Sequence, residues 1–214
     1  KRRDFIKQFS CACCAPFLLT SCAEVAITNR KQLSFVSEES INKQAKQAYN
    51  SIKKTENIIR SGNQVEMLNE VGKKVTTSVE NYFNEMGQFE TLKNYEWEYI
   101  LIDEPETLNA WCMPGGKIAF YTGILDITEN EDGMASVMGH EIAHAVAKHS
   151  LERASQSLAL KVGTTILDIA LEGALSSSSA DDYLVNLGLT LPFNRLQESE
   201  ADYLGLSFMT MAQY

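Results

Sequence analysis

Cysteine is almost absent from the body of this 214-residue sequence. Four of its five cysteines lie within the first 22 residues, and only Cys112 lies beyond them. A disulfide framework in the body would need at least two cysteines there, so none is available. This pattern fits either a reducing compartment or an exported protein that depends on its core and a metal for stability.

Net positive charge is lacking as well. The sequence contains 19 Lys and Arg residues against 28 Asp and Glu residues, which gives a formal net charge of -9. Because residues 1–21 are net basic, with four basic residues and one acidic, the remainder carries about -12. Phosphate binding depends on clustered Lys and Arg, so an acidic body argues against a nucleic-acid partner.

Long apolar runs are missing from the body. The most apolar later stretch, residues 158–175, contains Lys161, Asp168 and Glu172, whereas a membrane-spanning helix needs about 20 mostly apolar residues. We therefore expect a soluble body. At 214 residues and 44% hydrophobic content, the chain is long enough to bury one sizeable core and predicts a single domain.

The N-terminus has the layout of a signal peptide. A basic stretch, KRRDFIK, is followed by a moderately apolar run over residues 11–19. The pair Arg2-Arg3 resembles a twin-arginine export signal, and Leu19-Thr20-Ser21-Cys22 resembles a bacterial lipobox. We predict a signal peptide over residues 1–21 and lipidation of Cys22; the alternative is an ordinary amphipathic first helix.

The residues around the predicted lipid anchor indicate location and domain limits. Ala23 follows Cys22 where an Asp would favour inner-membrane retention, so we expect an outer-membrane lipoprotein facing the periplasm of a bacterial cell envelope. Residues 22–40 lack periodicity and are predicted to be a lipid-anchored tether. Residues 41–214 form the predicted folded domain. It ends within an apolar helical pattern, so we expect it to be truncated at the C-terminus.

Hydrophobic periodicity predicts a mainly helical α+β domain with a small antiparallel sheet. Apolar residues recur at helical spacing over residues 45–59 and 68–86, and they alternate over residues 95–101. Two further strands, residues 107–113 and 117–121, are joined by Pro114-Gly115-Gly116 as a hairpin. Helices are expected over residues 132–149, with Asp132 as the cap, 151–173 and 194–214, with a serine linker at residues 176–179.

The motif His140-Glu141-Ile142-Ala143-His144 is the strongest functional indication. Four residues on a helix correspond to about 400°, so the two imidazoles lie on one face, one turn apart, and can hold one zinc ion together. Glu141 lies between them, where it can act as a general base towards a water molecule. All three histidines of the sequence fall within ten residues. The alternative, a helix that carries two unrelated histidines, would not explain this clustering.

A catalytic zinc usually has three protein ligands, so a third must lie elsewhere. His149 is nine positions from His140, roughly 180° around an ideal helix, and is interpreted as structural. Glu198 and Asp202 are four apart and share a helix face, whereas Glu200 points away. We predict Glu198 as third ligand and Asp202 as acceptor of a ligand's spare N–H. The alternative is a solvated acidic face.

Three segments, HEIAHAVAKH, NRLQESEAD and NAWCMPGGKIAFYTGIL, resemble the gluzincin family of CAAX prenyl proteases and their bacterial lipoprotein relatives in outer-membrane quality control. The resemblance covers residues 42–214. It implies a zincin-like metallopeptidase domain with the sheet beside the HExxH helix. It also implies one Zn²⁺ per chain, bound by His140, His144 and Glu198, with Glu141 as base and Asp202 as the supporting acid.

The same resemblance implies polypeptide substrates. It places Asn109 and Ala110 on an edge strand whose free backbone groups pair with an extended substrate; a plain hairpin strand is the alternative. Membrane-spanning helices are not expected here, so exported or misfolded envelope proteins are expected as substrates rather than prenylated ones. A zinc-dependent metalloendopeptidase is thus predicted. The alternative is a metal-containing chaperone or assembly scaffold with little or no proteolysis, against which Glu141 argues, since a structural site needs no base.

Overall fold

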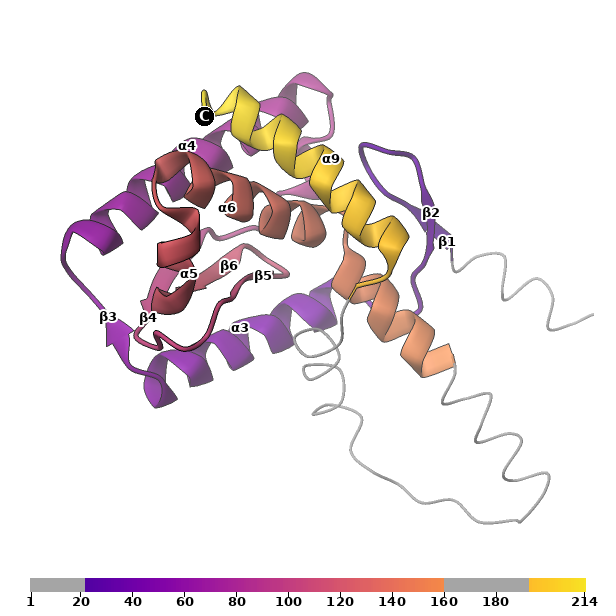
Figure 1. Ribbon diagram of the computed structural model, residues 1–214. Coiled ribbons are helices and arrows are strands. Elements are labelled where there is room, and N and C mark those ends of the chain that lie inside the picture. Colours follow the sequence, from indigo (N-terminus) through magenta and orange to yellow (C-terminus); the bar gives the residue numbers. More distant parts are fainter. Residues whose placement is uncertain (1–21, 160–192) are drawn as a thin grey trace, which may run out of the picture.

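The computed structural model describes residues 22–159 and 193–214 (Figure 1). Most of these described residues are helical, and the strands are short. In chain order the elements are β1 (Cys22–Glu24), β2 (Lys31–Leu33), α3 (Glu38–Thr55), β3 (Ile58–Ile59), α4 (Asn63–Glu85), η1 (Phe89–Thr91), β4 (Glu98–Ile102), β5 (Ala110–Met113), β6 (Lys117–Tyr121), α5 (Thr122–Thr128), α6 (Glu131–Val146), a helical segment over residues 149–159, and α9 (Arg195–Met211).

The central sheet has four strands in the order β3-β4-β6-β5. β5 and β6 form the predicted antiparallel hairpin, with Cys112 opposite Ile118. β4 pairs with β6 in parallel and β3 with β4 in antiparallel fashion, so the sheet is mixed rather than purely antiparallel. Among the residues that the structure describes, β5 has a sheet neighbour on one side only, which makes it an edge strand beside α6.

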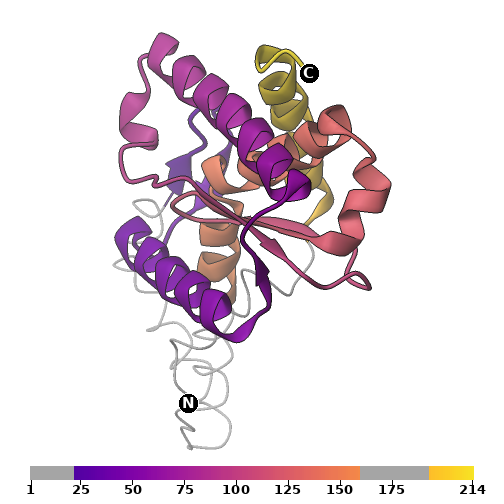
Figure 2. The same cartoon turned by 90° about the vertical axis from the view of Figure 1, so that its left-hand side faces the viewer.

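Alternating side chains divide the core into two layers. One face of the sheet packs against α3, and the other contributes to the larger cluster with α4, α6 and α9. Figure 2 shows α3 and α4 on opposite sides of the strands. Strand residues alternate in this way because successive side chains point to opposite faces. Those facing α3 include Ile100, Ile102, Met113 and Ala119, and those facing α4 and α6 include Leu101, Cys112, Ile118 and Phe120.

α6 is the central helix of the larger layer. It is buried on most sides, which fits its largely apolar sequence. Its N-cap is Asn130, whose side chain accepts a hydrogen bond from the Gly133 amide at 3.0 Å. The expected cap, Asp132, instead lies in the first turn, where its charge suits the helix dipole. α9 begins with a capping box between Asn194 and Gln197.

The helix predicted to run to His149 ends three residues earlier. Lys148 adopts a left-handed conformation with φ 57°, so the chain turns after Ala147 and a new helical segment starts at residue 149. The continuous helix was therefore a wrong prediction at this end. Much of the next predicted helix, residues 151–173, and the serine linker at 176–179 lie outside the described residues, as does the predicted signal peptide.

The predicted tether is also wrong for residues 22–33. β1 and β2 form an antiparallel hairpin, with Ala23 opposite Gln32. Val25 is 3% exposed, and Arg30 forms ion pairs with Glu152 and Glu200, so the hairpin is attached to the domain. Strands of three residues are too short to produce a recognisable alternation. Within the described residues, none of the helices is long and apolar enough to span a bilayer.

Candidate metal centre and cleft

Three side chains converge where α6 and α9 cross. The Nε2 atoms of His140 and His144 lie 3.0 Å apart, and the Glu198 carboxylate lies 3.5 Å from the first and 3.7 Å from the second. A tetrahedral zinc ion with ligand bonds of about 2.0–2.2 Å holds its ligand atoms roughly 3.3–3.6 Å apart. The three observed distances lie within a few tenths of an ångström of this range, and two imidazoles with one carboxylate are a donor set that zinc uses.

The close approach of the two helices depends on two glycines. A Cβ atom added to Gly139 would lie 2.7 Å from the Gly205 carbonyl oxygen, and one added to Gly205 would lie 2.7 Å from the His140 amide nitrogen. Both obstacles are backbone atoms, which cannot move aside as a flexible side chain can. The absence of side chains at this crossing lets α9 bring Glu198 and Asp202 up to the histidines of α6.

The Nδ1 atoms of His140 and His144 have different partners. His140 Nδ1 lies 2.9 Å from Asp202 Oδ1, so Asp202 is within hydrogen-bond distance of this ring. His144 Nδ1 instead lies 2.8 Å from His149 Nδ1. On a continuous helix, His149 would lie on the side opposite to His140, as predicted from the spacing. Because the helix breaks at Lys148, His149 folds back and contacts His144.

Burial sets the charge state of the site. Desolvation, followed by the neighbouring His149 and His140, lowers the pKa of His144 to about 2 and keeps its imidazole neutral, as a metal ligand must be. Desolvation and the charge of Glu198 raise the pKa of Glu141 to about 8. A bound cation would oppose the latter shift by favouring the carboxylate. Glu141 thus has the environment of a proton-transferring group.

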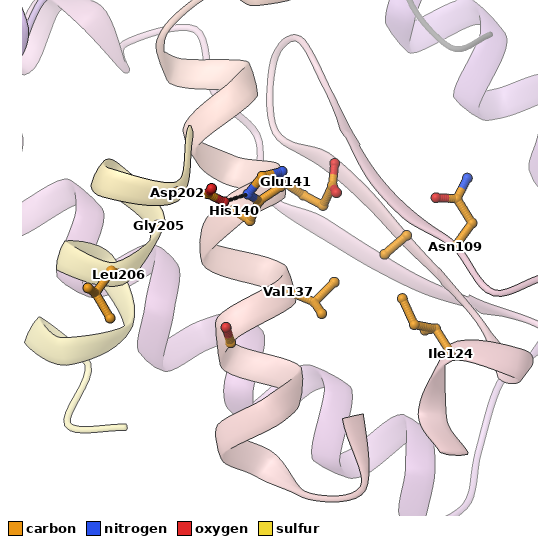
Figure 3. A pocket seen from close by; sticks show the side chains of 10 residues that line it. Asn109, Ile124, Val137, His140, Glu141, Asp202, Gly205 and Leu206 are labelled. Carbon is orange, nitrogen blue, oxygen red and sulfur yellow. Dashed lines mark hydrogen bonds and ion pairs between the residues drawn. The ribbon is translucent and has the colours of Figure 1, made fainter. Parts of the chain in front are cut away.

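A cleft of about 380 Å³ opens beside the histidines (Figure 3). His140 and Asp202 lie on its α9 side, and Asn109 and Ile124 lie on the opposite side. Asn109 is exposed, whereas Ala110 at the start of β5 is 5% exposed. The cleft is lined by Asn109, Ala110, Ile124, Ser136, Val137, His140, Glu141, Asp202, Gly205 and Leu206. The predicted catalytic base and the edge strand therefore face the same space.

Sequence reasoning missed several residues that shape this site. Glu200 was predicted to point away from Glu198, and it does, but it accepts a hydrogen bond from His149 rather than facing solvent. Phe193 stacks on the His144 ring at 3.8 Å between ring centroids. In the sequence, the close packing at this site was indicated by Gly205, a glycine inside an otherwise helical pattern. A glycine in such a position often has a packing reason.

Several known metallopeptidases are similar in sequence to this chain. The mitochondrial metalloendopeptidase OMA1 of Schizosaccharomyces pombe is 32% identical over 203 residues, which are 92% of this chain and 55% of that protein. OMA1 of Arabidopsis thaliana is 36% identical over 124 residues, 58% of this chain and 24% of that protein. Metalloprotease YcaL of Escherichia coli is 30% identical over 97 residues, 44% and 37% of the two chains. The chain thus spans about half or less of these relatives.

A family model, Peptidase family M48, matches residues 73–214. The match takes in α4 from residue 73 onward, the hairpin strands β5 and β6, and both helices that form the candidate metal centre. The S. pombe relative adds similarity over nearly the whole chain. This match and the similarity to these relatives show that the chain belongs to peptidase family M48.

Proposed function

We propose that this chain is a zinc-dependent endopeptidase with one Zn²⁺ per chain, held by His140, His144 and Glu198. The observation that supports this most directly is the convergence of these three donors, within 4.8 Å of one another, beside a cleft that is lined by His140 and Glu141. Three protein ligands, with a fourth position left for water or substrate, are typical of a catalytic rather than a structural zinc site.

Zinc, when bound, makes water a better nucleophile near neutral pH and polarises the scissile carbonyl. Glu141 transfers the proton: it takes the proton from the attacking water and delivers it to the leaving amine. Its buried setting beside Glu198 raises its proton affinity, which suits both steps. Asp202 accepts the Nδ1–H of His140 and so leaves Nε2 free for the metal.

The substrate is proposed to bind as an extended strand along β5. β5 is an edge strand, and Asn109 and Ala110 lie at its start, on the cleft. Unpaired backbone groups on an edge can bind a polypeptide of any sequence, which suits a protease that degrades many proteins. Val137, Ile124 and Leu206 would then contact apolar substrate side chains in the cleft.

The biological setting is a proposal that rests on the N-terminal residues. We propose that residues 1–21 are a signal peptide and that Cys22 is lipidated, with residues 41–214 as the peptidase domain. The proposed location is the outer membrane of a bacterial envelope, facing the periplasm, and the proposed substrates are exported or misfolded envelope proteins. Cell fractionation of Cys22→Ser with a fatty-acid label tests this: a label retained by the variant would refute the anchor.

The catalytic proposal is tested on protein that starts at residue 22 and carries Cys22→Ser. Zinc content and casein cleavage are measured for this protein and for Glu141→Gln. Cleavage that is lost in Glu141→Gln, with bound zinc unchanged, would support a zinc peptidase with Glu141 as base. Zinc binding without cleavage in either protein would favour the alternative, a chaperone or assembly scaffold. Asp126→Asn, an exposed substitution away from the cleft, is the control.

A further inference from the structure

A buried chain of polar side chains connects His144 with the N-terminal hairpin. His144 Nδ1 lies 2.8 Å from His149 Nδ1, and His149 Nε2 lies 3.0 Å from Glu200 Oε2. Arg30 Nε donates to the same Glu200 oxygen at 2.6 Å, and the Thr28 hydroxyl donates to the other. The His149 side chain is fully buried and that of Glu200 is 6% exposed, so water does not compete for these hydrogen bonds.

The order of donors and acceptors in this chain follows from its two ends. A metal at His144 needs the lone pair of Nε2, so the ring proton of this neutral imidazole is on Nδ1. That proton can be donated only if His149 Nδ1 is bare. The proton of His149 then sits on Nε2, where it is donated to the Glu200 carboxylate. A doubly protonated His149 would place two N–H groups face to face.

We propose that His149 is a positioning residue that fixes the tautomer and ring orientation of His144 for metal binding, and that Glu200 and Arg30 hold His149 in turn. The inference rests on the proposed metal site, because His144 must be a ligand for its tautomer to matter. It gives His149 a role in the chemistry of the site that neither its sequence spacing nor the HExxH motif indicates.

The surroundings of the chain hold its members in place from three directions. The guanidinium of Arg30 also pairs with Glu152 at 3.0 Å, and Glu152 accepts a hydrogen bond from Gln197 at the start of α9. The hairpin, the helical segment 149–159 and α9 therefore meet at one buried network. β1 begins at Cys22, so the segment next to the proposed lipid anchor helps to build the metal site.

Two substitutions at His149 separate the hydrogen bond from the packing. His149→Phe fills a similar volume without an acceptor, whereas His149→Asn can place an amide oxygen near the position of Nδ1. Zinc affinity is measured by competition with a chromophoric chelator. We expect His149→Phe to bind zinc about 10–100-fold more weakly and His149→Asn to retain most of the affinity. Leu151→Ala, buried in the same helical segment but in a separate apolar cluster, should lose stability and keep its zinc affinity.

Arg30→Met tests the part of the network that lies on the hairpin. Like His149→Phe, this variant is expected to bind zinc more weakly than the parent protein. The matched control is Lys31→Met, the same change at the exposed next residue, which should have no effect. Equal zinc affinities for Arg30→Met and Lys31→Met would overturn the part of the proposal that concerns the hairpin.

Nitrogen-15 NMR of the zinc-loaded protein gives a readout that is independent of activity. The sequence has three histidines, so their signals can be assigned by substitution. His149 is expected as a neutral ring with its proton on Nε2, opposite to His140 and His144, which should carry theirs on Nδ1. A His149 ring that is doubly protonated, or protonated only on Nδ1, would overturn the proposal.

Failure of this inference can be told apart from failure of the proposed metal site. If His144→Ala binds zinc as tightly as the parent protein, the site itself is wrong. If His144→Ala loses zinc while His149→Phe and His149→Asn both keep the parent affinity, the site stands and the positioning role is refuted. Loss in His149→Phe together with retention in His149→Asn supports both.

Discussion

The two histidines of the candidate metal centre come from one helix but have opposite surroundings. His140 lies on the cleft, with a side chain that is 27% exposed, and its partner Asp202 is 74% exposed. His144 is 4% exposed, and its partner His149 is fully buried. One half of the site thus belongs to the solvent-facing cleft, and the other half belongs to the core.

This difference determines what each half contributes. A group that faces the cleft can exchange partners with water, so its loss affects chemistry more than folding. A buried polar group has no such replacement, and an unsatisfied donor or acceptor there costs about 1–3 kcal/mol. We therefore expect substitutions in the buried half to lower both metal affinity and stability, and substitutions in the open half to lower metal affinity alone.

The largest effect is expected from removing either histidine ligand. His140→Ala and His144→Ala should each lower casein cleavage about 10³-fold or more, since metal catalysis supplies several kcal/mol. In the metal-free state the two should differ. His144→Ala leaves a cavity and an unpaired His149 nitrogen, and should lower the free energy of unfolding by about 2–3 kcal/mol. His140→Ala should lower it by less than about 1 kcal/mol.

Urea unfolding of both variants without metal makes this measurement. The matched pair is useful because the two substitutions remove the same side chain from the same helix. Equal stabilities would contradict the division of the site into an open and a buried half.

The next largest effect is expected at the helix crossing that serves both halves. Gly205→Ala places a Cβ 2.7 Å from the His140 amide nitrogen, so α9 must move away and take Glu198 and Asp202 with it. We expect overpacking to cost about 1–3 kcal/mol and zinc affinity to fall about 10–100-fold. Gly72→Ala, which would press a Cβ against the Tyr99 ring, is the control, because neither residue belongs to the metal donors or the cleft lining. It should lose stability with zinc affinity unchanged.

Much of the open half could be predicted from sequence because it rests on local periodicity. The spacing of His140 and His144 defines a helix face, and the spacing of Glu198 and Asp202 defines another. Two histidines leave a catalytic zinc site one protein ligand short, so the second face is the expected source of the third ligand. The hairpin at Pro114-Gly115-Gly116 was predictable for a similar reason, since turn residues between two alternating runs have a recognisable chemistry.

The buried half was not predictable because it depends on a single backbone dihedral and on distant contacts. Lys148 adopts a left-handed conformation, which redirects the chain at His149. A lysine, unlike a glycine, does not indicate such a conformation in the sequence. One partner of Glu200, Arg30, comes from a hairpin 170 residues earlier. Its strands are three residues long, too short for an alternation to be recognised, so the segment was interpreted as a tether.

A smaller effect is expected where the hairpin meets the buried half. Arg30 is 26% exposed and pairs with two carboxylates that are 6–8% exposed. Arg30→Met leaves these carboxylates without their cation, which should lower the free energy of unfolding by about 1–2 kcal/mol, less than for a fully buried pair. Urea unfolding of Arg30→Met and Lys31→Met, both without metal, measures this difference. No loss in Arg30→Met would show that the ion pairs of the hairpin add nothing to stability.

The smallest effect is expected from Asp202→Asn in the open half. The amide oxygen can still accept the Nδ1–H of His140, so only the negative charge is lost, and zinc affinity should fall about 10-fold or less. Because Asp202 is exposed, salt should screen its charge, and the gap between Asp202→Asn and the parent protein should narrow as ionic strength rises. The deficit of His149→Phe lies in a buried hydrogen bond and should not change with salt. Chelator competition at low and high salt compares the two, and an identical salt response would show that the open and buried halves do not differ.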